Sequence, residues 1–464
     1  MKTKCFLVLI ALIIFALNLT WAQDGNNLGF QLIYNDPLNS NLGGIDGAQR
    51  VEYMTVIPDS DGDGAQEIVF CPRLGGTAPQ GAALEVYEAT GDDTYARSWS
   101  WQGVSSVFYR SDVAASADLD GNGTREILMG VNSNVTDFLA VFENVGSNDW
   151  GTSPRLYTYQ NMTGSVPAAD VDFASLIAAG DFDGDGKDEV LLCNTNVQDL
   201  MIICSVASGT FAAGDVVWSL EFERNWEATD KGSPYAIAVG HIDTDNYTDI
   251  AVICWDLLRV DIYECTGANT YVLRSSNNLT ATDDYSWYAC EITDLDNDGN
   301  GELWLFNIQN GGLYAAEISD VATVTAVDFK LVFDLTYFGG AGNGQINMDF
   351  GDQDHGPGSD GPDLYLVGEA DNKIIDLEYN GGDPLSSASW TKYDIPALTS
   401  STDTLWMVEA PETDLDGDNL KEIVYTRQDA NGTRPGGLGT DKAAPSLFVQ
   451  EFTIPTSSYT WNIY

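Results

Sequence analysis

Positively charged residues are scarce in this sequence, which has 20 Lys and Arg against 70 Asp and Glu and a net charge of −50. A protein neutralises the phosphates of nucleic acid or of an anionic membrane with Lys and Arg, so we expect neither as a partner. Histidine is rarer still, with only His241 and His355. Both lie in acidic loops, so a Ser-His-Asp or Cys-His triad is not expected, and their number excludes a histidine cluster for zinc.

Long apolar runs are absent after residue 22. Before it, Lys2 and Lys4 precede an apolar run that ends at Leu17, and small residues flank a cleavage point after Ala22. This order predicts a secretory signal peptide over residues 1–22. A membrane anchor is the alternative, but the run is short and no second span follows. We therefore expect a soluble exported chain, secreted, periplasmic or at the cell surface, without membrane insertion.

The cysteines form no metal or redox pair of the C-x-x-C type. Those after residue 22 are Cys71, Cys193, Cys204, Cys254, Cys265 and Cys290, all in apolar, strand-like runs. Two pairs with equal spacing, Cys193/Cys204 and Cys254/Cys265, leave disulfides within hairpins open. Buried thiols are the better interpretation, because a disulfide needs close and well-aligned Cβ atoms.

Helical periodicity is also absent after residue 22. Short runs rich in Val, Ile, Tyr, Phe, Trp and Thr alternate with clusters of Gly, Asn, Asp and Ser, a pattern typical of an all-β fold. The first repeat shows four such runs, at Val51–Ile57, after Glu67, at Leu84–Glu88 and at Tyr95–Trp101. The second repeat shows four more, over residues 111–117, 126–131, 138–143 and 155–159.

One acidic loop recurs between the first two strands of each repeat. Its clearest copy has Asp181, Asp183 and Asp185 at positions 1, 3 and 5, Gly186 at position 6 and Glu189 at position 9. Carboxylates at alternate positions of a tight loop can point at one hard cation, and oxygen ligands suit Ca²⁺. Glycine at position 6 allows the positive φ of a sharp reversal. Such crowded carboxylates repel one another unless a cation binds among them, so folding and binding should be coupled.

The pattern occurs seven times, with first positions 53 to 65 residues apart. The candidate metal ligands are Asp59, Asp61, Asp63 and Glu67 in loop 1; Asp118, Asp120, Asn122 and Glu126 in loop 2; Asp181, Asp183, Asp185 and Glu189 in loop 3; Asp243, Asp245 and Asp249 in loop 4; Asp294, Asp296, Asp298 and Glu302 in loop 5; Asp352, Asp354, Asp360 and Asp363 in loop 6; and Asp414, Asp416, Asp418 and Glu422 in loop 7. Loop 4 has His241 at position 1, and loop 6 is stretched from Asp349 by an insertion. About five to seven Ca²⁺ are expected, with loops 4 and 6 left open.

Four-stranded units repeated at this period predict a β-propeller of seven antiparallel blades over residues 51–464. Residues 23–50 form an N-terminal segment in which Gly29–Tyr34 resembles an outer strand that would close the last blade. Tyr459–Tyr464 resembles an outer strand too. Because the two cannot share one place, an eight-bladed ring is the alternative.

The loops differ from EF-hands, which carry a bidentate Glu at position 12. Here position 12 is apolar or aromatic, as at Phe70 and Leu192, and the acid stands at position 9. With that acid the pattern resembles the FG-GAP/VCBS repeats of secreted bacterial proteins and the calcium-binding hairpins of the integrin α-subunit propeller. The tripeptides FG and GAP are not evident, which places the chain nearer the VCBS branch. The resemblance implies a bacterial source, side-chain ligation from positions 1, 3, 5 and 9, and a main-chain carbonyl ligand at position 7.

The resemblance also implies an extracellular module for binding, adhesion or interaction, with a glycan or protein partner. Its binding surface would be the face opposite the metal loops, where we expect Trp255, Arg73, Arg427 and Arg434, with further tryptophans at Trp101, Trp226 and Trp287. The alternative at these positions is solvated charge and tryptophan packing between blades. An enzyme, a calcium-dependent polysaccharide lyase or hydrolase, is the rival function, because a catalytic carboxylate pair is not excluded.

Overall fold

The computed structural model describes residues 30–36, 48–74, 83–102, 109–133, 137–166, 176–194, 199–226, 233–254, 259–278, 287–307, 311–334, 345–353, 362–368, 373–397, 404–428 and 447–452. Strands dominate this part of the chain, with one short helix, α2 (Tyr159–Thr163), and one 3-10 turn, η2 (Ser387–Ser389). The all-β prediction is therefore confirmed.

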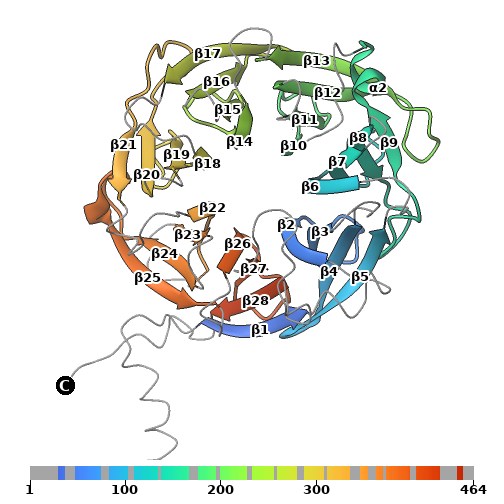
Figure 1. Cartoon of the computed structure of the whole chain (residues 1–464). Coiled ribbons are helices and arrows are strands. Elements are labelled where there is room, and N and C mark those ends of the chain that lie inside the picture. The colour runs from blue at the N-terminus through green and yellow to red at the C-terminus, as the bar shows by residue number, and fades with distance from the viewer. Residues whose placement is uncertain are drawn as a thin grey trace, which may run out of the picture.

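Seven four-stranded antiparallel blades stand around a central opening (Figure 1), and pairing of Arg50 with Gln428 joins the first and seventh blades into one eight-stranded sheet. From the inner to the outer strand, the blades are β2 (Ala48–Ile57), β3 (Glu67–Leu74), β4 (Ala83–Gly91), β5 (Thr94–Gln102); β6 (Tyr109–Ala117), β7 (Glu126–Ser133), β8 (Asp137–Phe142), β9 (Arg155–Thr158); β10 (Leu176–Gly180), β11 (Glu189–Asn194), β12 (Leu200–Ser208), β13 (Val217–Asn225); β14 (Pro234–Gly240), β15 (Asp249–Cys254), β16 (Arg259–Cys265), β17 (Tyr271–Asn278); β18 (Trp287–Thr293), β19 (Glu302–Asn307), β20 (Gly312–Glu317), β21 (Lys330–Phe333); β22 (Gln345–Gly351), β23 (Asp363–Gly368), β24 (Lys373–Tyr379), β25 (Trp390–Pro396); and β26 (Thr404–Glu409), β27 (Glu422–Gln428), β28 (Leu447–Phe452), β1 (Phe30–Asp36). The predicted seven-bladed propeller is confirmed.

The seventh blade is completed by the N-terminal strand. β1 pairs antiparallel with β28, from Phe30 opposite Phe452 to Asp36 opposite Leu447. The outer strand of the last blade therefore comes from the beginning of the chain, beside the first blade (Figure 1). The competing segment, residues 459–464, lies outside the described residues.

The second strand of each blade explains the continuous apolar runs that follow the acidic loops. All six residues are buried in β11, β15, β19 and β23. Neighbouring blades cover both faces of these strands, so the apolar residues form a continuous run instead of alternating with polar ones. Outer strands such as β13 are half-buried or exposed.

The core consists of seven apolar clusters, one between each pair of neighbouring blades. The cluster at the closing junction joins Met54 and Tyr87 of the first blade to Val424 and Val449 of the seventh. Hydrophobic burial thus acts mainly between blades, and it stabilises the closed ring at every junction.

The six cysteines are buried thiols, and strand register explains why they form no hairpin disulfides. Cys193 lies opposite Met201, and Cys204 lies opposite Val190, so the two cysteines do not face each other. Cys254 likewise lies opposite Arg259 in its hairpin. The interpretation as buried thiols fits these positions.

Candidate metal centres at the blade hairpins

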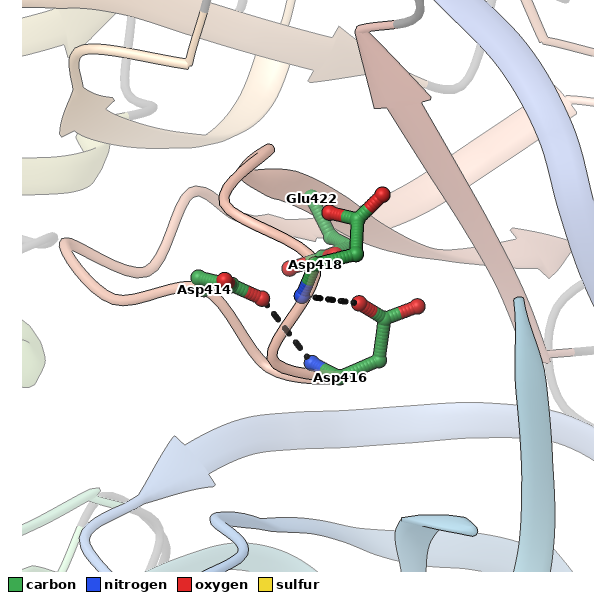
Figure 2. Close-up of side chains that lie close together, drawn as sticks. All are labelled: Asp414, Asp416, Asp418 and Glu422. Carbon is green, nitrogen blue, oxygen red and sulfur yellow. Dashed lines mark hydrogen bonds between the residues drawn. The ribbon is translucent and has the colours of Figure 1, made fainter. Parts of the chain in front are cut away.

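Loop 7, between β26 and β27, brings its four predicted ligands together (Figure 2). One oxygen each of Asp414, Asp416, Asp418 and Glu422 lies within 4.8 Å of the others. The backbone organises this group: Asp414 Oδ1 accepts from the Asp416 N–H at 3.2 Å, and Asp416 Oδ1 accepts from the Asp418 N–H at 3.3 Å. The alternate spacing therefore turns successive carboxylates toward one point.

The first three loops repeat this arrangement with their acids at positions 1, 3 and 9. The grouped residues are Asp59, Asp61 and Glu67; Asp118, Asp120 and Glu126; and Asp181, Asp183 and Glu189. Position 5 is not part of these three groups. In all four loops its side-chain oxygen accepts from the N–H of position 7, as Asp185 does from Lys187 at 3.0 Å and Asp418 does from Leu420 at 2.8 Å. Loop 5 keeps the same bonds, with Asp294 Oδ2 accepting from the Gly299 N–H at 3.0 Å.

The reversal at position 6 needs a left-handed residue. Gly186 has φ of 88°, and Asn419 takes φ of 79° at the same position of loop 7. Asparagine enters this region more readily than most residues, so the substitution in loop 7 preserves the turn. In both loops the N–H of this residue donates to the position-1 carboxylate, Asp181 or Asp414.

The acid at position 9 is the most constrained member of each loop. Glu126, Glu189, Glu302 and Glu422 are fully buried, and each accepts one hydrogen bond of 2.8 to 3.0 Å from the N–H of position 2. In all four, Oε1 is buried and has no hydrogen-bond partner among the described residues. Burial raises the pKa of Glu126 and Glu189 to about 9. Glu67 differs, since both of its oxygens accept from the Ser60 N–H.

These orphaned oxygens test whether a cation fits. A buried carboxylate oxygen without a donor is costly unless a positive charge lies beside it. In loops 2, 3 and 7 the glutamate is grouped with the carboxylates of positions 1 and 3, and all of these donors are hard oxygens. The residues therefore fit Ca²⁺, with positions 1, 3 and 9 as the side chains that would hold it.

Loop 4 departs from this pattern only at position 1, where His241 stands. Asp249 accepts from the Ile242 N–H at 2.9 Å, and Asp243 Oδ1 accepts from the Asp245 N–H at 3.0 Å, as in the other loops. Asp249 Oδ1 is also buried without a hydrogen-bond partner among the described residues. In loop 6, Asp352 is half-buried directly after β22, and Asp363 is buried at the start of β23. Asp354 and Asp360 lie outside the described residues. Asp349 lies inside β22, so it does not begin the loop.

A contact that the sequence did not reveal joins five of the loops to the next blade. The second oxygen of the position-3 carboxylate accepts from a backbone N–H in the next blade's outer hairpin. These pairs are Asp61 with Asn148, Asp120 with Phe211 (2.8 Å), Asp183 with Asn269 (2.5 Å), Asp243 with Val321 (2.6 Å) and Asp416 with Asp93 (2.8 Å). The position-3 acid therefore connects its own loop to the neighbouring blade.

The inner strands carry a second group of acids that the loop pattern did not predict. Glu291, Asp349 and Glu409 stand at one register of β18, β22 and β26, opposite the second-strand residues Trp304, Tyr365 and Val424. The other four inner strands have Thr55, Ala115, Ala178 and Ala238 at this register.

These inner acids contact the next inner strand. Asp349 Oδ2 accepts from the Ala410 N–H at 2.6 Å, and the carboxylate of Glu409 accepts from the Val56 N–H. Burial raises the pKa of all three acids, with Asp349 at about 7, and Asp349 adds to the shift of Glu291 and Glu409.

The expected ligand-binding residues fall largely outside what the structure describes. Trp255 and Arg434 lie outside the described residues. Arg73 and Arg427 belong to β3 and β27, but their side chains are not among those described. Trp287 likewise begins β18 without a described side chain.

Two of the tryptophans expected on that face are packed into the molecule. Trp226 is fully buried and donates to Asp261 Oδ2 at 2.8 Å. Trp101 is half-buried against Phe142, with ring centroids 5.2 Å apart. Both sequence positions precede a connection between blades, where an indole fills space between two sheets. The prediction that Trp226 lies on an open binding face is therefore wrong. Trp101 packs against the core residue Phe142.

Comparisons with known proteins show the fold and no family. No protein-family model matches the sequence. No curated protein matches it either. Among solved structures, BBS1N in complex with ARL6DN is similar at 9% identity and a TM-score of 0.50, over 92% of this chain and 98% of that one.

Two further solved structures give the same result. Virginiamycin B lyase from Staphylococcus aureus, in a catalytically inactive form with quinupristin, is similar at 11% identity and a TM-score of 0.50, over 91% of this chain and 98% of that one. A lectin from Agrocybe aegerita that recognises non-reducing terminal N-acetylglucosamine has 15% identity and a TM-score of 0.45, over 76% and 81%. The two structures with a TM-score of 0.50 support a shared fold only. In the described part of the chain, no helix is long and apolar enough to cross a membrane.

Proposed function

We propose that this protein is an exported, calcium-stabilised propeller of the FG-GAP/VCBS type that serves as an extracellular module for binding, adhesion or interaction. One observation carries the metal part of the proposal: the buried, donor-free Oε1 atoms of Glu126, Glu189, Glu302 and Glu422 at position 9 of their loops. In this proposal Ca²⁺ binds beside them and neutralises the carboxylates that crowd each hairpin. The net charge of −50 also favours bound cations, because they reduce the repulsion between the acidic residues.

Metal analysis and thermal unfolding test this role. The mature chain, equilibrated with Ca²⁺ and freed of excess ion, should contain about five Ca²⁺ or more, as loops 1, 2, 3, 5 and 7 require. Removal by EDTA should lower the Tm by many degrees, because ions that bind only the folded state stabilise it. A chain without bound Ca²⁺, or one with an unchanged Tm in EDTA, would contradict the proposal.

The binding role rests on the division between the two ends of the propeller. The hairpins joining first and second strands hold the acids, so metal binding would rigidify one face and leave the other for a partner. The sequence predicts Trp255 and Arg434 in loops at that face, and Arg73 and Arg427 belong to β3 and β27. Aromatic and cationic side chains of this kind suit an acidic glycan or an acidic protein surface.

A glycan array that includes uronate-containing polysaccharides, together with pull-downs of secreted proteins, tests the partner class. Trp255→Ala and Arg434→Ala should weaken binding without changing the calcium content. Arg155→Ala is a matched control, since Arg155 donates to the carbonyl oxygens of Phe211 and Ala212 on an outer hairpin. Equal binding by all three variants would exclude the face opposite the metal loops.

A second candidate function, calcium-dependent polysaccharide cleavage, is favoured by the inner-strand acids. Glycoside hydrolysis uses two carboxyl groups, one of which is an acid of raised pKa. The pKa of Asp349 is raised to about 7, and burial also raises that of Glu291 and Glu409. The hydrogen bonds from Ala410 and Val56 give Asp349 and Glu409 a structural role as well.

Reducing-end assays on acidic and neutral polysaccharides separate the two functions. Activity that is lost in Glu291→Gln and Glu409→Gln, while both variants keep the wild-type Tm, would support a hydrolase. No activity on any polysaccharide, together with binding on the array, would leave the binding module.

A further inference from the structure

The outer hairpins of three blades present the same left-handed residue to the preceding metal loop. Asp93, Asn148 and Asn269 have φ of 56°, 57° and 55°. The N–H of each donates to a position-3 carboxylate, that of Asp416, Asp61 or Asp183 respectively. We name these places the closing, first and third junctions; the closing junction joins the seventh blade to the first. The three residues are structurally equivalent, so their side chains can be compared directly.

At the first and third junctions this residue is an asparagine whose amide donates to nearby carboxylates. Asn148 donates to Asp63 Oδ2 at 3.4 Å and also hydrogen-bonds Glu88, a third-strand acid opposite Glu67. In the amide orientation that satisfies its neighbours, Asn269 donates to Glu221 at 2.7 Å. An amide N–H₂ is thus the donor that each acidic pocket receives from the next blade.

At the closing junction the equivalent residue is Asp93, which brings a further carboxylate instead of a donor. One oxygen each of Asp92, Asp93 and Asp416 lies within 4.8 Å of the others. Glu451 of β28, the counterpart of Glu88, lies opposite Glu422 and within hydrogen-bonding reach of the Asp93 and Asp418 carboxyls. Among the described residues, no Lys or Arg forms an ion pair with these acids.

Glu451 itself points to a missing partner. The residue is 3% exposed, and its Oε1 is buried without a hydrogen-bond donor in the described part of the chain, as Oε1 of Glu88 is at the first junction. The closing junction differs because the carboxylates of Asp92 and Asp93 lie at this place and no amide does. A buried carboxylate surrounded by other carboxylates needs a positive charge or a proton. Because Asp416 belongs both to this group and to the loop 7 group, its two oxygens can serve two neighbouring ions.

We propose that the closing junction holds a second divalent cation, ligated by Asp92, Asp93 and Asp416 with Glu451 beneath them, in addition to the ion of loop 7. The oxygen-only donor set fits Ca²⁺. This cation binds the seventh blade to the first at the junction where the ring is closed by strands from both ends of the described chain. The inference shares its ion with the proposed function but concerns a separate site.

Reciprocal substitutions test the site, with Ca²⁺ per chain measured by native mass spectrometry and elemental analysis of the mature protein. Asp93→Asn gives the closing junction the amide of the first junction, and the variant should bind one Ca²⁺ fewer than wild type. At the first junction Ser147 and Asn148 stand where the closing junction has Asp92 and Asp93. The double variant Ser147→Asp/Asn148→Asp supplies both carboxylates beside Asp61 and should bind one Ca²⁺ more. Ala268→Asp/Asn269→Asp is a second gain-of-site variant at the third junction, and Asp149→Asn is a control at an outer hairpin.

The outcomes separate this inference from the proposed function. If wild type binds several Ca²⁺ and neither Asp93→Asn nor Ser147→Asp/Asn148→Asp changes that number, Glu451 shares a proton and the second site does not exist. If wild type binds no Ca²⁺, the proposed function fails as well. If Asp93→Asn does not fold, the double variant still decides, because no gain of Ca²⁺ in that variant overturns the inference. A crystal of the calcium form should show two anomalous peaks flanking Asp416.

Discussion

The Nδ1 atom of His241 lies 2.8 Å from the backbone carbonyl oxygen of Tyr247. These residues stand at positions 1 and 7 of loop 4, and the family resemblance assigns both positions to the metal. The imidazole therefore hydrogen-bonds the carbonyl oxygen that would otherwise be the Ca²⁺ ligand at position 7. Imidazole is also a poor ligand for Ca²⁺, which prefers oxygen. We predict that this contact keeps Ca²⁺ out of loop 4, even though Asp249 has the buried, donor-free oxygen of the other position-9 acids.

Replacing His241 should convert loop 4 into a calcium site. His241→Asp supplies the carboxylate of position 1 and releases the Tyr247 carbonyl, while Asp243, Asp245 and Asp249 are already in place. We expect one more Ca²⁺ per chain and a higher Tm in Ca²⁺, but a lower Tm in EDTA because another acid joins the cluster. His241→Leu, which removes the ring without adding an oxygen, should show no gain. An unchanged calcium content in His241→Asp would refute this account.

Substitution of a position-9 acid should remove the Ca²⁺ of its own loop. Glu189→Gln keeps the bond from the Phe182 N–H but removes the charge of the buried carboxylate. The variant should bind one Ca²⁺ fewer and lose several degrees of Tm in Ca²⁺, since a lost ligand acts through mass action. In EDTA its Tm should equal or exceed that of wild type, because a buried uncompensated carboxylate is destabilising.

The matched control for this substitution is Glu223→Gln in β13, where the glutamate is exposed. Its calcium content and Tm should match those of wild type in both buffers. If Glu189→Gln were destabilised equally in Ca²⁺ and EDTA, Glu189 would have a packing role instead of a metal role.

Stability should depend on pH with opposite signs in the two metal states. Without Ca²⁺, burial raises the pKa of Glu126 from 4.5 to about 9 and that of Glu422 to about 8. Between these limits the unfolded chain loses its protons and the folded chain keeps them, so the free energy of unfolding falls as pH rises. With Ca²⁺, binding requires the ionised carboxylates, so stability should rise with pH.

Urea unfolding at pH 5.5 and pH 8 checks this inversion. The EDTA form should have its higher midpoint at pH 5.5, and the calcium form should have its higher midpoint at pH 8. The same direction in both forms would show that these carboxylates do not control stability. Glu126→Gln should reduce the pH dependence of the EDTA form, because it removes one of the raised groups.

The sequence predicted the metal ligands within each hairpin, but it did not predict the hydrogen bonds between a hairpin and the next blade. Ligands at positions 1, 3, 5 and 9 repeat at fixed spacing, so a single loop contains its own signal. The contacts of Asp120 with Phe211 and of Asp243 with Val321 use a backbone N–H, which nearly every residue has, so the partner's side chain leaves no signal in the sequence. No residue pattern could reveal them, because they exist only once the blades are placed side by side.

The inner-strand acids escaped prediction for a related reason. Glu291 shows no spacing motif in its own strand, and it meets Asp349 only because successive inner strands share one register. Ring closure, in contrast, was within reach of the sequence. Gly29–Tyr34 already resembled an outer strand, and the choice between it and the C-terminal segment depended on pairing with β28.

A buried ion pair predicts a stability effect that does not depend on calcium. Asp261 is fully buried in β16 and accepts hydrogen bonds from Arg259 at 3.0 Å, Ser276 at 2.7 Å and Trp226 at 2.8 Å. Trp226 follows the outer strand of the third blade, so this carboxylate connects the third and fourth blades. Asp261→Asn keeps the side-chain shape but removes the carboxylate charge that pairs with the buried Arg259.

Breaking a buried pair in this way typically costs about 3 to 5 kcal/mol. We expect urea unfolding of Asp261→Asn in saturating Ca²⁺ to show a loss of that order, with the calcium content unchanged. The control is Asp328→Asn, which breaks the exposed pair of Asp328 with Lys330 and should cost less than about 1 kcal/mol. If the two variants were equally stable, the Asp261 network would not hold the two blades together, and their junction would depend on the apolar cluster around Trp226 alone.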